Sequence, residues 1–286
     1  MKSVLIIGCG DIARRTIPLL RGRYRLYALV RNVNQFAALR VLGVTPVTGD
    51  LDNRHKLSRI AGLADIVLHL APPPNNGAQD TRTRHLLTAL SQGALPGQLI
   101  YISTSGVYGD CGGEYVDETR PPHPQTPRAQ RRVDAELQIR RWAVRNGVRA
   151  SILRVPGIYA ADRLPLERIR AGTPAIVAAE DGYTNHIHAD DLAHILVAAL
   201  GHGRPNRIYN TSDDGEMKMG DYFDVAADAS HLPRPPRITR AEAQRVLPEP
   251  LLSFLNESRR LGNKRLKQEL KARLDYPTVR DFLASV

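Results

Sequence analysis

Short apolar runs alternate with longer amphipathic stretches along the first two thirds of the chain. The run at 4–8 is apolar on both faces, as expected of a strand buried within a parallel sheet. Further strands are predicted at 25–31, 44–51, 64–74, 98–105 and 149–159, and helices at 11–21, 34–43, 81–92 and from about 128 to 145. Strands and helices that alternate at this spacing predict βαβ units, and therefore an α/β fold with a Rossmann-type, doubly wound parallel sheet.

The pattern becomes less regular after residue 159. A helix is predicted at 188–203, because two aspartates fall in its first turn and glycines near its end, and a short strand follows at 207–212. Proline-rich connectors separate short helices in the rest of the tail. We expect a Rossmann core at 1–159, to which 188–212 returns, and a small C-terminal α/β lobe for a substrate or partner, formed by 160–187 and 213–286.

The net charge of +11 raises the question of a nucleic-acid partner. The basic residues are spread over many predicted helices, and the densest groups lie at 128–145 and 258–273. Glu257 and Glu269 accompany the second group, as is typical of a solvated helix face. We therefore expect a basic surface around a site for anionic ligands, and no nucleic-acid partner.

Membrane insertion and metal binding have little support in the sequence. No apolar stretch approaches the roughly 20 residues of a membrane helix, and the run at 4–8 is too short for a signal peptide. Cys9 and Cys111 lie far apart, without a CxxC pair or histidines at zinc spacing. We expect a cytoplasmic protein with no disulfide framework, no metal site and no membrane partner.

The segment GCGDIA, at 8–13, has the G-x-G-x-x-A spacing of a dinucleotide-binding turn and directly follows the first predicted strand. Gly8 allows a tight turn, Gly10 lets the backbone approach a pyrophosphate, and the small Ala13 allows close packing of helix on strand. The helix N-terminus then faces the negative charge. The predicted cofactor-binding residues of this turn are Gly8, Gly10, Asp11, Ile12 and Ala13.

The end of the second strand indicates which dinucleotide is bound. An NAD site places a carboxylate there for the ribose hydroxyls, whereas an NADP site needs a cation for the 2′-phosphate. This chain has Arg31 followed by Asn32, which favours NADP(H) over NAD(H). The Asp50 carboxylate, after the third strand, is expected to accept from the adenine amino group. Further cofactor contacts are predicted from Leu51, Leu70, Ala71 and Pro72.

Taken together, these motifs resemble those of a known family. The order GCGDIA, TGDL, VLHLAPPP, YISTSGVYGD, LRVPGIY and HADDLA, from Val4 to about Ser212, resembles the extended short-chain dehydrogenase/reductases, the NAD-dependent epimerase/dehydratase group. The tail looks like that of atypical members usually described only as NAD(P)-binding proteins. The resemblance implies a Rossmann fold, an NAD(P) cofactor, and oxidoreductase or epimerase chemistry on a small molecule.

The resemblance also implies a catalytic Ser/Thr, a Tyr, and a Lys four residues after the Tyr. The stretch PQTPRAQRR, at 124–132, aligns with the family segment that carries the Tyr and Lys, and places Arg128 and Arg132 at those two positions. Thr104 matches the Ser/Thr. An arginine stays protonated and cannot exchange protons near neutrality, although Arg132 can still hold the cofactor. The two arginines also suit an anionic substrate.

Two functions therefore stay open from the sequence. One is an NADP(H)-dependent oxidoreductase or epimerase-like enzyme whose proton donor lies elsewhere, with Tyr108, Tyr115 and Tyr159 as weak candidates. The other is a catalytically inactive sensor or scaffold that binds a dinucleotide. Family resemblance makes a homodimer through the helices around 81–92 and 128–145 a further expectation.

Overall fold

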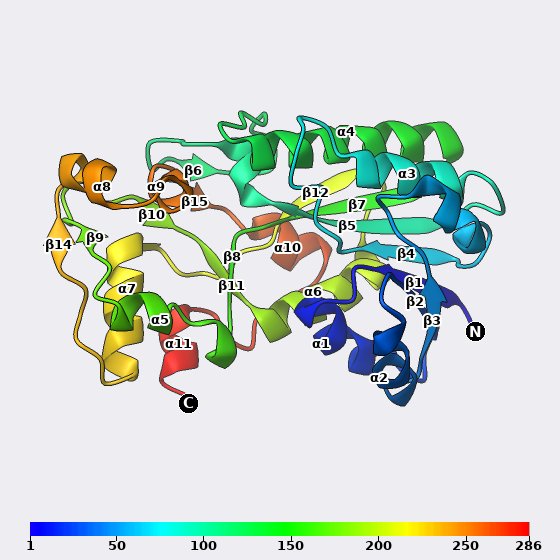
Figure 1. The fold of residues 1–286 in the computed structure, drawn as a ribbon, viewed down its shortest axis with the longest axis horizontal. Coiled ribbons are helices and arrows are strands. Elements are labelled where there is room, and N and C mark those ends of the chain that lie inside the picture. The colour runs from blue at the N-terminus through cyan, green and yellow to red at the C-terminus, as the bar shows by residue number, and fades with distance from the viewer. Residues whose placement is uncertain (286) are drawn as a thin grey trace.

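The computed structural model describes residues 1–285 and is built on a seven-stranded parallel sheet (Figure 1). The sheet contains β1 (Ser3–Ile7), β2 (Arg25–Val30), β3 (Val44–Thr48), β4 (Ile66–His69), β5 (Gln98–Thr104), β7 (Arg149–Val155) and β12 (Arg207–Asn210). Its order is β12-β7-β5-β4-β1-β2-β3, and every pairing is parallel. The predicted doubly wound Rossmann sheet is confirmed. The connections run in opposite directions on the two sides of β1, which creates a ligand-binding crevice at the carboxyl ends of the strands.

Helices cover both faces of the sheet, and each face has its own apolar cluster (Figure 1). One face carries α1 (Asp11–Leu20), α2 (Phe36–Val41), α6 (Ala189–His202) and α10 (Lys264–Glu269). The other carries α3 (Thr81–Leu90), α4 (Pro127–Asn146) and the 3-10 helix η2 (Arg54–Ile60). Within residues 1–285, no helix is long and apolar enough to cross a membrane.

The smaller lobe consists of short helices and paired strands of two or three residues. The helices are α5 (Leu166–Arg170), α7 (Met219–Ala229), α8 (Arg240–Val246), α9 (Glu249–Leu255) and α11 (Val279–Leu283), and a 3-10 turn, η4 (Ala161–Arg163), precedes α5. Two further 3-10 turns, η1 (Val33–Gln35) and η3 (Ser105–Tyr108), follow strands β2 and β5 of the central sheet. The strand pairs are β8 (Gly157–Tyr159) with β11 (His186–His188), β9 (Ala175–Ile176) with β14 (Arg237–Ile238), β10 (Tyr183–Thr184) with β13 (Met217–Lys218), and β6 (Tyr115–Val116) with β15 (Arg260–Leu261).

The single strand predicted at 149–159 is wrong, because the chain divides at Pro156. β7 stays in the central sheet, whereas β8 leaves it and pairs with β11. Proline has no backbone N–H to donate to a neighbouring strand, which accounts for the break. The chain therefore turns from the core into the lobe at this residue.

Helix α4 begins within the PQTPRAQRR stretch. The Thr126 side chain accepts a hydrogen bond from the Ala129 N–H as the N-cap, and Pro127 occupies the first turn. Gly147 ends the helix in the left-handed conformation, with a φ of 66°. Arg128 and Arg132 therefore lie in the first two turns of a long helix at the carboxyl edge of the sheet.

A buried ion pair fixes α4 to the sheet. Arg154 on β7 donates two hydrogen bonds to Glu136 on α4, at 3.1 and 2.7 Å, and the two side chains are 2% and 4% exposed. The Ser103 hydroxyl donates to the same carboxylate at 2.6 Å. Such a pair strongly destabilises a protein when one partner is removed, because the other charge is left buried alone.

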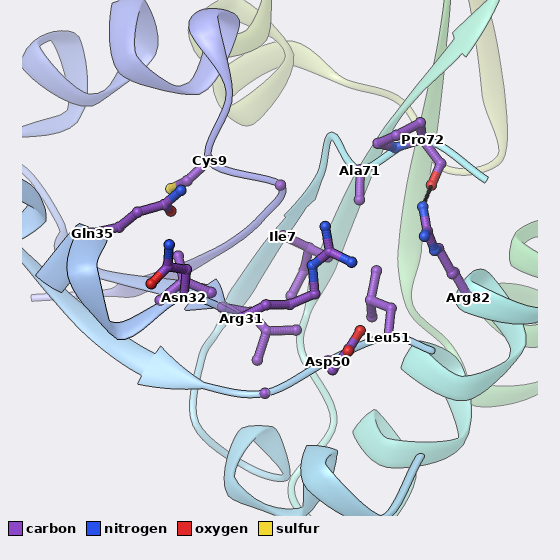
Figure 2. Close-up of a pocket in the computed structure, with 14 residues that line it drawn as sticks. Ile7, Cys9, Arg31, Asn32, Gln35, Asp50, Leu51, Ala71, Pro72 and Arg82 are labelled. Atoms are coloured by element: carbon purple, nitrogen blue, oxygen red, sulfur yellow. Dashed lines mark hydrogen bonds between the residues drawn. The ribbon is translucent and has the colours of Figure 1, made fainter. Parts of the chain in front are cut away.

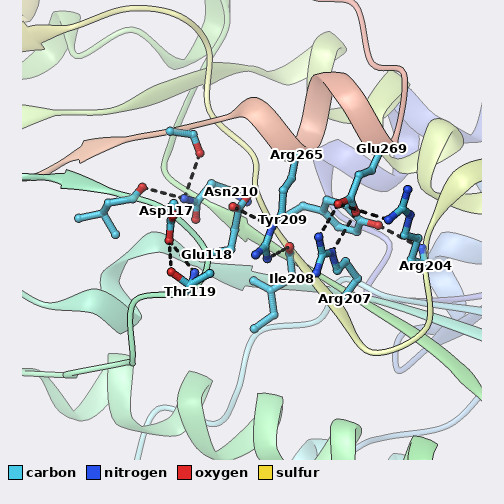
Figure 3. Close-up of polar contacts among 12 residues, drawn as sticks. Asp117, Glu118, Thr119, Arg204, Arg207, Ile208, Tyr209, Asn210, Arg265 and Glu269 are labelled. Carbon is cyan, nitrogen blue, oxygen red and sulfur yellow. Dashed lines mark hydrogen bonds and ion pairs between the residues drawn. The ribbon is translucent and has the colours of Figure 1, made fainter.

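The basic tail at 258–273 is not the solvated helix face predicted from its charge pattern. It forms β15, a turn and the short α10, and it returns to the edge of the central sheet. Arg207 and Arg204 both form ion pairs with Glu269 (Figure 3). Arg265 forms an ion pair with Glu118, with 3.4 Å between the charged groups. The Glu269 side chain is 11% exposed, so this segment holds the tail against β12.

Candidate functional site

A cleft of about 450 Å³ lies at the carboxyl ends of β1, β2 and β3 and beside the chain that leaves β4 (Figure 2). It brings together many of the residues predicted to bind the cofactor: Gly8, Arg31, Asn32, Asp50, Leu51, Ala71 and Pro72. Cys9, Gln35 and Arg82 also line it and were not predicted. The burial of Cys9 raises the pKa of its thiol to about 11, so this group stays protonated near neutrality.

Gly8 is required by the close approach of two strand ends. Its φ is +95°, and a Cβ at this position would stand 2.6 Å from the Ala71 nitrogen. Gly10 differs, because a Cβ there would meet no atom within 4 Å. The glycine turn therefore packs tightly against β4 at one residue and faces open space at the other.

Several predicted cofactor residues lie outside the lining of this cleft. Asp11 is bound by Arg15 and Arg163, each at 2.9 Å; burial raises its pKa, but these hydrogen bonds outweigh burial and lower it overall. Gly10 caps α1, Ile12 and Leu70 pack against the core, and Ala13 is buried. Asp11 thus ties the start of α1 to the segment that leads into the lobe.

Arg31, Arg82 and Asp50 are the charged residues that line the cleft, and Asp52 lies next to both arginines. Arg82 donates to both oxygens of Asp52 at 2.7 Å and to the carbonyls of Pro72 and Pro73 at 3.2 and 3.3 Å. The hydrogen bonds from Arg82 hold the pKa of Asp52 below its ordinary value. The guanidinium of Arg31 lies 3.9 Å from Asp52, and its side chain is 69% exposed. Arg31 is therefore accessible to a ligand in the cleft.

A second cavity, of about 530 Å³, lies between the end of β5 and the small lobe. Thr104 and Arg128 line it, together with Tyr183, His186, Glu257 and other residues of the lobe. The Arg128 guanidinium stacks on Phe254, with 4.1 Å to the ring centroid. Arg132 does not line this cavity or the first cleft; it donates to the Tyr101 hydroxyl at 3.0 Å and to the Ile102 carbonyl at 2.7 Å.

The three tyrosines considered from the sequence do not line the second cavity. Tyr108 donates to Asn210 at 2.7 Å, and burial raises its pKa to about 12. Tyr115 donates to Glu216 at the surface, and Tyr159 is fully buried outside the cavity lining. These positions exclude all three as direct proton donors to a molecule in the cavity as it stands.

The histidines of the site stay neutral near pH 7. His186 lines the second cavity and stacks on Tyr222 at 4.2 Å, and burial lowers its pKa to about 4. His69 is buried in β4 beside Thr83, at 2.9 Å, and burial lowers its pKa to about 3. His188 accepts from the Asp190 N–H at the start of α6. His69 and His188 therefore make hydrogen bonds within the fold, to Thr83 and to the start of α6.

Sequence reasoning missed Glu257 and Arg259, which the tail brings to the second cavity. The two side chains are 8% and 9% exposed and form an ion pair at 2.8 Å. The charge pattern of the tail pointed to a solvated surface, so no signal in the sequence separated Glu257 from its exposed neighbours.

Comparison with known proteins gives a consistent result. The model of the NAD dependent epimerase/dehydratase family matches residues 4–212. The GDP-6-deoxy-D-mannose reductase of Pseudomonas aeruginosa is 27% identical over 184 residues, which are 57% of this chain and 60% of that protein. A conserved protein of unknown function from Silicibacter pomeroyi has a TM-score of 0.79 and 28% identity, and the match covers 100% of this chain and 98% of that one.

A solved structure with a bound cofactor shares the fold at lower identity. The UDP-glucuronic acid 4-epimerase from Bacillus cereus, in complex with NAD, has a TM-score of 0.76 and 17% identity, and the match covers 99% of each chain. This level of identity supports the same fold and no more.

Proposed function

The chain belongs to the NAD dependent epimerase/dehydratase family, and from that premise we propose that it is an NADP(H)-dependent oxidoreductase or epimerase-like enzyme acting on a small anionic molecule. The observation that carries the proposal is the cleft at the carboxyl edge of the sheet, with Gly8 and Arg31 in its lining. The chemistry that a bound dinucleotide supplies is the uptake or release of a hydride.

The residues of the cleft fit a dinucleotide. The turn after β1 leads into α1, whose N-terminus carries unpaired backbone N–H groups and a positive end of the helix dipole. Space is open above Gly10, where a pyrophosphate would pass. Asp50 lines the cleft, and we propose that its carboxylate accepts a hydrogen bond from an adenine amino group.

Arg31 supports NADP(H) rather than NAD(H). It is the charged residue that the end of β2 contributes to the cleft, where an NAD site would offer a carboxylate. Its guanidinium is exposed and lies near Asp52, whose charge Arg82 largely satisfies. A 2′-phosphate would therefore replace a long, solvent-screened ion pair of Arg31 with a direct one.

Binding of both dinucleotides to Arg31→Asp tests the cofactor preference. We expect the dissociation constant for NADP(H) to rise about 10- to 100-fold, as for a lost charge-assisted hydrogen bond, and that for NAD(H) to change little. Arg59→Asp, an exposed change of equal charge on η2, is the matched control. Equal weakening of both dinucleotides by Arg31→Asp would refute the preference, and no binding by the unaltered protein would refute the whole proposal.

The second cavity is proposed to hold the substrate. Arg128, Arg163 and Arg259 line it with Glu257, so a carboxylate or phosphate suits it. Thr104, at the end of β5, is proposed to orient a substrate oxygen, and Arg132 to reach the cofactor ribose after leaving the Ile102 carbonyl. The GDP-sugar named for the Pseudomonas relative makes nucleotide sugars the first compounds to test.

One observation favours an alternative, an inactive dinucleotide-binding sensor or scaffold. Arg128 lines the substrate cavity at the position aligned with the family's tyrosine, and an arginine cannot exchange protons near neutrality. Tight NADP(H) binding without turnover of nucleotide sugars, aldehydes or ketones would favour this alternative over the enzyme.

A homodimer through α3 and α4 and a cytoplasmic location complete the proposal. Leu137 and Val144 on α4 are exposed apolar residues. Cys9 and Cys111 are both free, which suits a reducing compartment. Val144→Asp is expected to shift sedimentation toward the monomer. If the unaltered protein already sediments as a monomer, the proposed dimer is refuted.

A further inference from the structure

Glu257 is a carboxylate with one oxygen left without a partner at the wall of the substrate cavity. Its Oε2 accepts from Arg259 at 2.8 Å, whereas its Oε1 is buried and has no hydrogen-bond partner. The side chain is 8% exposed. A buried carboxylate oxygen ordinarily has a donor, so the protein leaves the carboxylate of Glu257 only partly satisfied.

Glu257 lies beside the position from which the family's catalytic groups act. A Cβ built on Gly106 would stand 3.6 Å from the Thr104 hydroxyl oxygen and 3.8 Å from Oε2 of Glu257. The missing side chain of Gly106 thus leaves the hydroxyl and the carboxylate facing a common space. The same carboxylate acts electrostatically on Arg128, whose pKa burial lowers and Glu257 partly restores.

The tail around Glu257 is held firmly. The Ser258 carbonyl accepts from the N–H groups of Cys111 and Gly113, both at 3.0 Å, and the Ser258 N–H donates to Asp110 at 2.8 Å. On the other side, the Ser258 hydroxyl accepts from the Tyr183 N–H at 3.0 Å. These bonds fix the backbone next to Glu257 between the loop after β5 and strand β10, which a proton-transfer group needs.

Glu257 also separates two cavities. It lines the substrate cavity and an outer cavity of about 640 Å³ formed by the start of α4 and by α9. Arg128 is the other residue common to both linings. Glu257 and Arg128 therefore lie at the boundary between the two cavities.

We propose that Glu257 is the general acid and base of this enzyme, in place of the tyrosine that the family uses; the inference rests on the proposed oxidoreductase function. When an alcohol is oxidised, its hydroxyl proton would pass to the carboxylate of Glu257, and its carbinol carbon would lose a hydride, which a dinucleotide held in the cleft would accept. When a carbonyl is reduced, the Glu257 carboxyl would return the proton to the carbonyl oxygen as the carbonyl carbon gains a hydride. Thr104 donates a hydrogen bond to the same substrate oxygen, and Arg128 holds an anionic part of the substrate.

Turnover by Glu257 variants tests this assignment. UDP-, GDP- and dTDP-sugars, aldehydes and ketones are offered with NADPH, and the corresponding alcohols with NADP⁺. For any compound that the unaltered protein converts, Glu257→Gln is expected to lower kcat about 100-fold or more, the usual range for a lost acid–base group. Glu257→Asp keeps part of the activity, and formate restores part of it to Glu257→Ala.

Binding measurements separate chemistry from folding, because Glu257→Gln leaves Arg259 without its ionised partner. We expect each Glu257 variant to bind NADPH, followed by its fluorescence, with the affinity of the unaltered protein. Glu167→Gln, an exposed change on α5, is the matched control and keeps full activity.

Three outcomes overturn the assignment. Activity of Glu257→Gln within about threefold of the unaltered protein removes Glu257 from catalysis while the proposed function stands. Loss of activity in Tyr183→Phe with retention in Glu257→Gln transfers the role to Tyr183, which also lines the cavity. No turnover by the unaltered protein, despite NADPH binding, overturns the enzyme function and the role of Glu257 together.

Discussion

The cleft proposed for the cofactor and the cavity proposed for the substrate both lie at the carboxyl edge of the sheet, yet they are constructed differently. The cleft is formed by chain that directly follows β1 to β4, with Arg82 added from α3. The cavity takes Thr104 from the end of β5 and most of its remaining wall from the lobe and the tail. The cleft therefore depends on local turns, whereas the cavity depends on contacts between distant parts of the chain.

This difference implies that the residues of the two regions are constrained in different ways. Residues of the cleft are constrained by backbone packing, as at Gly8, which has no room for a side chain. The walls of the cavity are side chains on a separate lobe, and one such side chain can be exchanged without moving the sheet. The replacement that we propose, of a tyrosine on α4 by a carboxylate from the tail, is a change of this second kind.

The largest loss of stability is expected when the buried ion pair between Arg154 and Glu136, which fixes α4 to the sheet, is broken. Glu136→Ala leaves Arg154 buried without its partner, and we expect a loss of about 3–5 kcal/mol in the free energy of unfolding. Urea denaturation measures it. Glu114→Ala removes a solvent-exposed ion pair with Arg120 and should change the free energy of unfolding far less. Equal costs for the two variants would contradict the role given to the buried pair.

A change at Gly8 should affect the cleft alone. In Gly8→Ala the new Cβ meets the backbone of Ala71, and the strained turn should weaken dinucleotide binding about 10- to 100-fold. Fluorescence titration with NADPH gives the dissociation constant. Gly22→Ala has the same left-handed backbone with open space around it, so it should cost stability but leave binding unchanged. Unchanged NADPH binding by Gly8→Ala would show that the close approach of Gly8 to Ala71 is not needed for dinucleotide binding.

The buried carboxyl of Asp213 should make the free energy of unfolding depend on pH. Burial, with a smaller contribution from Asp214, raises the pKa of its carboxyl from 3.8 to about 8. Between these values the folded protein retains a proton that the unfolded chain has released, so stability falls as pH rises through this window. We expect a loss of about 2 kcal/mol between pH 6.5 and pH 8.5, by urea denaturation.

Asp213→Asn should remove this contribution. The amide oxygen can still accept from the Gly215 N–H, and it carries no charge at any pH. The variant should become more stable than the unaltered protein above pH 8. The same pH dependence in both proteins would assign it to other groups.

The smallest effect is expected at the cap of α4. Thr126→Ala removes the side-chain acceptor for the Ala129 N–H and should cost about 1 kcal/mol of unfolding free energy. Thr126→Ser keeps the acceptor and should stay within about 0.5 kcal/mol of the unaltered protein. Thermal unfolding distinguishes them. A loss in the serine variant as large as in the alanine variant would show that the cap contributes nothing.

Strands and helices with a clear hydrophobic period were predictable from the sequence. The central sheet and the helices that cover it follow the alternation of apolar runs and amphipathic stretches. The paired strands of two or three residues are too short to have a period, and their position depends on partners far along the chain. The separation of β8 from β7 at Pro156 shows the same limit, since the apolar pattern continues across the break.

The two regions also differ in how well the sequence predicted their residues. Arg31 and Asp50 could be placed in the cleft because each directly follows a strand of a parallel sheet. Glu257 could not be placed, because a glutamate among arginines is typical of a surface, and only tertiary contacts bury it. Arg82 was missed for a related reason: its partners are backbone carbonyls and an aspartate from another turn.

The pairing of the tail with the loop after β5 has a consequence for synthesis of the protein. Asp110 and Ser258, which bond to each other, lie 148 positions apart. At a translation rate of about 5–20 residues per second, the loop leaves the ribosome roughly 7–30 s before its partner. During that interval the nascent chain has its cofactor-binding edge but lacks one wall of the substrate cavity, so the ability to bind a dinucleotide should arise on the ribosome earlier than the ability to react.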